Sequence, residues 1–249
     1  MKEIDLEEAR SIDWDDVGRR YDPNMDWEDM LLIRQTARLI QRYAGNAKRV
    51  IEVGVSTGVM TRLLLQTFDR LHILDPAQVN LDRVLELSPN ERHRIVPHCG
   101  TVEGFKSEHP FDLAIFSFVL EHVEDPITAL RALTRLVRVG GQIAIAVPNF
   151  ESLNRRLGVE LGMVKRLDYF QEKDELVGHR RLYSVNRLRQ DIAAAGNLEE
   201  TVIHGLLLKP LSKAQMEIWR PEVLEAFCKV GLEFPSLCVA LFQMLERRA

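Results

Sequence analysis

Two hydrophobic patterns alternate along this chain. Short apolar runs, the pattern of buried strands, occupy residues 50–53, 71–74, 94–97, 113–118 and 142–147. Apolar residues at helical spacing separate these runs, as in the stripe from Ile127 to Val137. Strands that alternate with helices predict an α/β fold with a doubly wound, mostly parallel sheet.

The regular alternation stops after residue 150. Residues 150–183 read as an insertion, which at this point of an open sheet covers the carboxyl ends of the strands. The pattern then predicts a helix over 185–195, a sixth strand near 202–208, a helix around 214–230 and a seventh strand over 237–245. Gly140-Gly141 is expected to end the preceding helix and to open the fifth strand.

No repeat or low-complexity linker divides the sequence, so we expect a single domain over residues 1–249. Its predicted parts are an N-terminal helical lid at 1–46, a ligand-binding core at 47–149, a helical cap at 150–183, and C-terminal helices and strands at 184–249.

Composition narrows the class of partner. The net charge is −4 and no long basic block occurs, which argues against nucleic-acid binding and favours a small-molecule substrate. Three scattered cysteines without C-x-x-C spacing disfavour a disulfide framework and a thiolate zinc site, and predict a reduced, cytoplasmic protein. The sequence contains no run of eighteen apolar residues, so no membrane span is predicted.

The stretch from Arg49 to Leu65 predicts a strand, a tight loop and a helix. Its loop, Gly54-Val55-Ser56-Thr57-Gly58, suits a ligand laid against the backbone, because glycine takes positive φ cheaply and the helix start offers free N–H groups. A dinucleotide G-x-G-x-x-G pattern fails at Ser56 and at Val59. A serine-hydrolase elbow fits Ser56, but the upstream residues contain no HGGG-type oxyanion segment.

With Glu52 in front of it, this loop resembles the E/D-x-G-x-G-x-G loop of class I S-adenosylmethionine-dependent methyltransferases, with Ser56 at the middle glycine. Residues 111–126 are similar to the FDLV…LEHV-DP signature of ubiquinone- and menaquinone-biosynthesis methyltransferases and related small-molecule enzymes. The resemblance implies a Rossmann-like fold with a seven-stranded sheet, S-adenosylmethionine as cofactor and S-adenosylhomocysteine as product.

The resemblance also implies where the cofactor binds. Asp75 ends the second strand, where an acidic side chain can accept hydrogen bonds from both ribose hydroxyls. Thr101 and Val102 follow the third strand, in the loop that holds the adenine ring. The expected cofactor residues are Glu52, Gly54, Ser56, Gly58, Asp75, Pro76, Thr101, Val102 and Ser117, with Tyr21 and Arg34 as contacts from the N-terminal lid.

Catalysis is expected from histidine, whose ordinary pKa suits removal of a hydroxyl proton near neutral pH. His179 in the insertion is the first candidate for this base, and His122 after the fourth strand is the second. A metal is not expected, because Phe118 replaces the first glutamate of the E-x-x-E-H cluster seen in the quinone-biosynthesis relatives. The acceptor is expected to contact Asn149, Arg155, Arg180 and Tyr183, while Lys209 is expected to be a surface charge.

The sequence therefore predicts an O-methyltransferase that tailors a small metabolite, with a carboxyl or an amine as other acceptors. Two alternatives stay open at this point: a non-catalytic nucleoside-binding module, and a serine hydrolase that uses Ser56.

Overall fold

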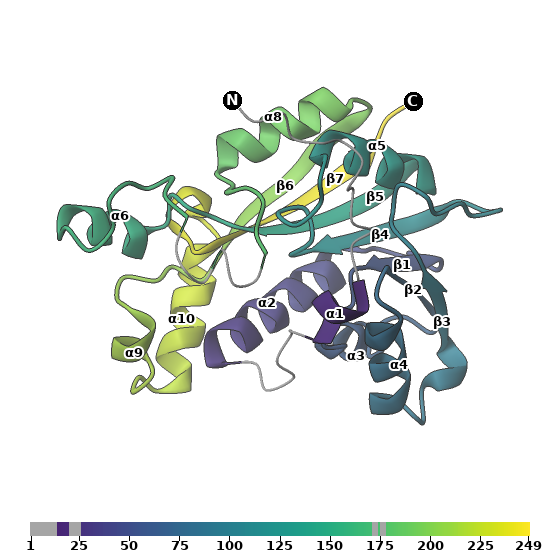
Figure 1. Ribbon diagram of the computed structural model, residues 1–249, viewed down its shortest axis with the longest axis horizontal. Helices are drawn as coiled ribbons and strands as arrows, with labels where there is room; N and C mark the ends of the chain where they lie inside the picture. Colours follow the sequence, from purple (N-terminus) through teal and green to yellow (C-terminus); the bar gives the residue numbers. More distant parts are fainter. Residues whose placement is uncertain (1–13, 20–25, 171–173, 175–177) are drawn as a thin grey trace, which may run out of the picture.

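The computed structural model describes residues 14–19, 26–170, 174 and 178–249. Seven strands form one sheet in the order β3-β2-β1-β4-β5-β7-β6 (Figure 1). β1 to β5 run parallel, and β7 lies antiparallel between β5 and β6. The predicted seven-stranded α/β sheet is confirmed, and β7 makes it mixed. The strands are β1 Val50–Val53, β2 Leu71–Asp75, β3 Ile95–Cys99, β4 Phe111–Ser117, β5 Val137–Pro148, β6 Leu198–Leu206 and β7 Ala240–Arg247.

Helices cover both faces of the sheet (Figure 1). One hydrophobic core joins the sheet to α2 (Trp27–Tyr43), α3 (Val59–Leu64), α4 (Gln78–Leu87) and α10 (Pro221–Gly231). A second core on the other face joins it to α5 (Pro126–Leu136) and α8 (Val185–Ala195). The shorter helices are α1 (Trp14–Arg19), α6 (Leu153–Glu160) and α9 (Lys213–Met216), with 3-10 turns at Arg92–Arg94 and Pro235–Leu237.

Local sequence signals determine where two of the longer helices begin. The Asp125 side chain accepts hydrogen bonds from the backbone N–H groups of Ile127 and Thr128, and Pro126 occupies the first turn of α5, as predicted. Asp26 caps α2 in the same way, through the N–H groups of Glu28 and Asp29. Each cap satisfies N–H groups that the helix itself leaves unpaired.

The predicted role of Gly140-Gly141 is wrong. α5 ends at Leu136, β5 begins at Val137, and both glycines lie inside that strand. A Cβ at Gly141 would lie 2.5 Å from a methyl carbon of Val137, so this glycine permits a close backbone approach. The single helix predicted around 214–230 is also wrong: Pro221 begins a separate helix, α10, after the short α9.

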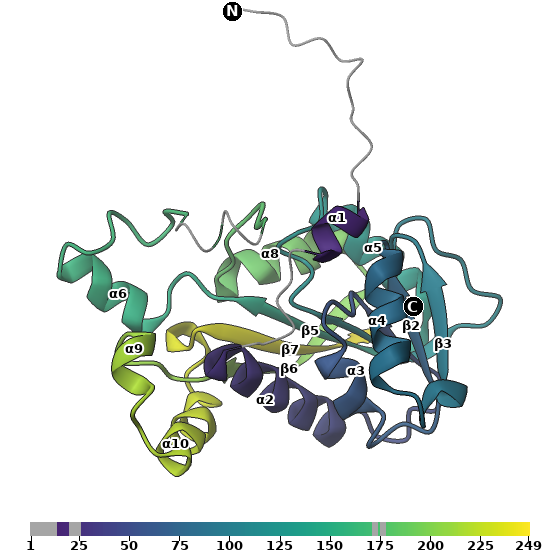
Figure 2. The ribbon, with the colours of Figure 1, turned by 60° about the horizontal axis from the view of Figure 1, so that its bottom comes forward.

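Figure 2 shows α6, α9 and α10 together at one end of the molecule, far from α4 and β3. α6 follows the carboxyl end of β5, and α9 follows that of β6. Within the described ranges, no helix has both the length and the apolar character needed to cross a bilayer.

Candidate active site

The glycine loop after β1 takes an unusual backbone path. Gly54 and Gly58 have φ of 79° and 78°, and Ser56 between them has φ of 44°. A Cβ at Gly54 would lie 2.4 Å from Val119 Cγ2, so only glycine fits this approach to the loop after β4. Ser56, at the position of the usual middle glycine, therefore adopts a left-handed conformation that costs a side-chain-bearing residue free energy.

Asp75 holds this loop in place. Its Oδ2 accepts hydrogen bonds from the N–H groups of Val55 (2.9 Å) and Ser56 (3.4 Å), and its Oδ1 accepts from Ala77 N (2.9 Å) and Asn80 Nδ2 (3.2 Å). Burial raises the pKa of Asp75, and these hydrogen bonds oppose the rise. The expected ribose contact stays a prediction, and the structure adds a second role for Asp75, that of shaping the loop.

Two polar atoms at neighbouring strand ends are buried and lack a hydrogen-bond partner among the described residues. They are Glu52 Oε1 at the end of β1 and Ser117 Oγ at the end of β4. Glu52 is fully buried, which raises its pKa to about 8, although Thr61 Oγ1 donates a 2.7 Å hydrogen bond to its other oxygen. Buried polar atoms without a partner are uncommon in proteins, and each one needs an explanation. A ligand bound at these two strand ends would provide one, so both atoms fit the cofactor that the resemblance implies.

Three of the remaining predicted cofactor residues follow neighbouring strands of the sheet. Pro76 is half-buried directly after β2, and Thr101 and Val102 follow β3, with Val102 buried in the core. Arg34 lies on the exposed face of α2. Tyr21 lies outside the described residues.

The two predicted catalytic histidines meet beyond β4. Their ring centroids are 4.9 Å apart at an interplanar angle of 63°, although 57 positions separate His122 from His179 in the chain. The buried Glu121 carboxylate joins them, and polar atoms of the three side chains all lie within 4.8 Å of one another. The expectation that no metal is needed stays a prediction.

Burial sets the charge state of this cluster. Burial, with a smaller contribution from the neighbouring His179, lowers the pKa of His122 to about 4. Burial also raises the pKa of Glu121 to about 7, while His179 and Arg181 oppose that rise. His122 is therefore a neutral imidazole near pH 7.

A carboxylate that the sequence did not reveal completes the cluster. Asp174 Oδ1 lies 3.0 Å from His179 Nδ1, and the His179 backbone N–H donates to the Asp174 carbonyl at 2.8 Å. Arg155 Nη1 lies 3.6 Å from Asp174 Oδ2. Arg155 thus pairs with this carboxylate, and its expected contact with the acceptor stays a prediction. The one sequence signal was an acidic residue five positions before the histidine.

Backbone contacts fix the insertion to the loop after β4. The Arg180 N–H donates to the Glu121 carbonyl at 2.9 Å. The buried Arg181 guanidinium donates to the carbonyls of Leu120 and Glu124, both at 2.8 Å. Arg181 was missed from sequence, whereas the Arg180 side chain is exposed, and its expected acceptor contact stays a prediction.

Two of the expected acceptor residues have structural partners. The buried Asn149 amide donates to the carbonyls of Ser236 (3.2 Å) and Cys238 (2.8 Å). The buried Tyr183 hydroxyl donates to Asp191 Oδ2 at 2.9 Å. These hydrogen bonds support the fold of this region, and the expected contacts of both side chains with the acceptor stay predictions.

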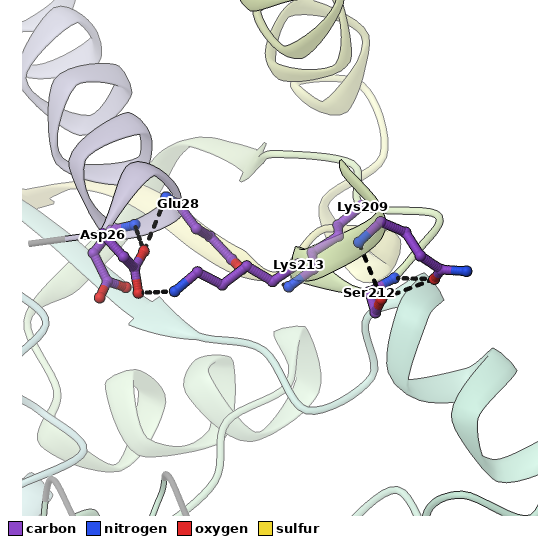
Figure 3. Close-up of polar contacts among 7 residues, drawn as sticks. Asp26, Glu28, Lys209, Ser212 and Lys213 are labelled. Carbon is purple, nitrogen blue, oxygen red and sulfur yellow. Dashed lines mark hydrogen bonds and ion pairs between the residues drawn. The ribbon is translucent and has the colours of Figure 1, made fainter. Parts of the chain in front are cut away.

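Lys209 is not a surface charge. It is 7% exposed, and its Nζ lies 2.6 Å from Glu28 Oε2. Figure 3 shows this pair beside the ion pair of Lys213 with Asp26. Both pairs tie the start of α2 to the segment after β6. A buried lysine needs a charged partner, and the partner of Lys209 lies 181 positions away in the chain. The residues next to Lys209 in the sequence therefore do not reveal that it is buried.

Comparison with known proteins extends these observations. The family described as "Methyltransferase domain" matches residues 27–197. A malonyl-[acyl-carrier protein] O-methyltransferase of Halorhodospira halophila is 30% identical over 188 residues, which are 70% of this chain and 62% of that protein. A ubiquinone biosynthesis O-methyltransferase of Aromatoleum aromaticum is 28% identical over 133 residues, 52% of this chain and 55% of that relative. The chain thus spans less than two thirds of the length of either relative.

Solved structures share the fold. The N-methyltransferase NodS from Bradyrhizobium japonicum WM9, in complex with S-adenosyl-L-homocysteine, superposes with a TM-score of 0.60. The alignment covers 96% of this chain and all of that one, at 14% sequence identity. At this identity the likeness establishes a Rossmann-like fold with a mixed seven-stranded sheet.

Proposed function

Because this chain belongs to the class I S-adenosylmethionine-dependent methyltransferases, we propose that it methylates a hydroxyl group of a small metabolite in a biosynthetic pathway. The observation that carries this proposal is the meeting of His179 with His122 beyond β4, which gives the acceptor a basic group. The names of the two relatives, both O-methyltransferases, support an oxygen acceptor. Membership of this family argues against both alternatives, the serine hydrolase and the non-catalytic nucleoside-binding module.

The cofactor supplies a methyl group that its own sulfonium charge already activates. In our proposal the loop from Gly54 to Gly58 presents its backbone to the cofactor, while Glu52 and Ser117 offer their buried unpartnered oxygens. Alignment of acceptor and methyl group contributes about 7–11 kcal/mol to such a reaction, whereas a general base contributes about 10²–10⁴-fold in rate. The protein's main task is therefore to hold the acceptor.

His179 is the better base of the two histidines. Burial lowers the pKa of His122 to about 4, so this imidazole takes up a proton poorly near neutral pH. His179 instead has the Asp174 carboxylate 3.0 Å from Nδ1, where it can stabilise the positive charge that the ring gains with the acceptor's proton. We assign proton removal to His179 and orientation of the acceptor to His122. In this proposal the insertion caps the acceptor pocket.

Transfer from tritiated S-adenosylmethionine to a library of phenols, aliphatic alcohols, carboxylic acids and amines tests this function. We expect labelled product from the hydroxyl compounds, and the label should survive mild alkali because ethers resist it. Label released as methanol would show a methyl ester and a carboxyl acceptor. Alkali-stable label on the amines alone would show N-methylation, and either result would overturn the proposed acceptor class.

A further inference from the structure

The side chain that faces His179 Nδ1 belongs to Asp174, which lies in the insertion between β5 and α8. The contact is 3.0 Å long, and the two side chains are 12% and 14% exposed. A backbone hydrogen bond of 2.8 Å between the same two residues fixes their spacing. The pair is therefore sheltered from solvent and held at two points.

An ionised carboxylate only accepts hydrogen bonds. Because Asp174 Oδ1 accepts from Nδ1, the neutral ring must carry its hydrogen on Nδ1 and its lone pair on Nε2. Arg155 lies on the far side of the carboxylate, with Nη1 3.6 Å from Oδ2, and its side chain is 10% exposed. The positive charge of Arg155 favours the ionised form of Asp174.

We propose that Asp174 is a positioning residue for methyl transfer, which orients the His179 ring and keeps Nε2 as the free basic nitrogen. This inference rests on the proposed function, because it assigns the acceptor's proton to His179. When that proton arrives, the imidazolium lies beside a carboxylate that stabilises its charge. The acceptor's O–H bond breaks, its proton moves to Nε2, and Asp174 keeps its own ionisation state.

The other groups around the ring do not provide this orientation. His122 contacts His179 through its ring, and its own Nδ1 lies 3.4 Å from the carbonyl of Gly178. Burial raises the pKa of Glu121, so this carboxyl is partly protonated near neutral pH. Among the residues that the structure describes, the charged and titratable groups facing His179 are thus Asp174, His122 and Glu121, with Arg155 and Arg181 behind them.

The test is Asp174→Asn, with Asp168→Asn as the matched control. Asp168 lies in the same insertion, its side chain is 59% exposed, and it pairs with Arg166 at the surface. Asparagine keeps the size of the side chain but can present an N–H group to Nδ1, which permits the wrong ring tautomer. We expect kcat to fall by about 10–10²-fold, part of the total contribution of a general base. The KM of the acceptor and the Kd of S-adenosylmethionine should stay near the parent values.

A conservative variant and a double variant separate orientation from packing. Asp174→Glu should recover part of the lost rate. In a His179→Gln background, Asp174→Asn should change kcat by less than about twofold, since a residue that acts through His179 has nothing left to orient.

Three results would overturn the inference. They are an Asp174→Asn variant that matches Asp168→Asn, a loss confined to cofactor affinity, or a further loss beyond about fivefold in the His179→Gln background. If Asp174→Asn fails to fold, the kcat of Asp174→Glu, measured alone and in the His179→Gln background, decides the question. Failure of the proposed function is distinguishable, because the parent protein would then transfer no label to any hydroxyl compound.

Discussion

Replacement of Ser56 by glycine should stabilise this protein. Ser56 has φ of 44°, a left-handed conformation that costs an L-residue roughly 1–2 kcal/mol. Glycine adopts this conformation without that strain. It also gives the unfolded chain more conformational entropy, which lowers the free energy of unfolding by roughly 0.4–1 kcal/mol. The backbone N–H keeps its hydrogen bond to Asp75 in either case. The difference is a net gain of about 0–1.5 kcal/mol in the free energy of unfolding.

Urea unfolding of the parent, Ser56→Gly and Ser56→Ala measures this gain. Alanine keeps the Cβ and therefore the strain, so it should show no gain. Because we assign Ser56 a backbone role, Ser56→Gly should also keep methyl transfer and cofactor affinity. A glycine variant less stable than the alanine variant would refute the strain reasoning. Loss of all activity in a folded, cofactor-binding glycine variant would instead point to chemistry at the Ser56 hydroxyl.

Three further predictions concern buried charges. Asp75→Ala should weaken cofactor binding by a few kcal/mol, because ribose hydroxyls and loop N–H groups both lose their acceptor; unchanged affinity by calorimetry would remove Asp75 from the site. The pKa of Glu52, ordinarily 4.5, is raised to about 8, so the folded state binds more protons than the unfolded state between these values. The stability that this group contributes is therefore fully present below pH 4.5 and is lost as pH rises to about 8. The difference in unfolding free energy, Glu52→Gln minus parent, should grow steadily from pH 5 to pH 8, because glutamine does not titrate. A difference that stays constant with pH would contradict the assignment of Glu52 as a buried acid. Lys209→Met should cost about 3–5 kcal/mol in denaturant unfolding by leaving Glu28 buried and unpaired, and Glu28→Gln in that background should recover part of the loss; a cost below about 1 kcal/mol would mean that the pair is solvated.

Local signals in the sequence were sufficient for much of the fold. The strand predicted at 50–53 and the helix predicted at 185–195 have those bounds in the structure. Ser184 caps that helix through the N–H of Arg187, so its start depends on neighbouring residues alone. Alternating strands and helices then leave few possible sheet topologies.

Features that depend on distant partners were not predictable in this way. The sequence at Gly140 and Gly141 is typical of a helix end, but β4 pairs with Val137 before them and with Gln142 after them. β5 therefore continues through both glycines as an irregularity in the strand. Lys209 reads as a surface charge until Glu28 lies beside it. Asp174 gave no pattern of its own, because its role comes from folding of the insertion onto the loop after β4. Tertiary contacts override local propensity at such positions.

The most direct test of the account is the turnover number of His179→Ala, measured at saturating S-adenosylmethionine with the hydroxyl compound that the parent methylates best. If His179 removes the acceptor's proton, turnover should fall by about 10²–10⁴-fold while the cofactor Kd stays unchanged. Thermal unfolding should show that the variant keeps the parent fold, because His179 belongs to neither hydrophobic core. A turnover number within about twofold of the parent would contradict the account and would show that the base lies elsewhere or is not needed.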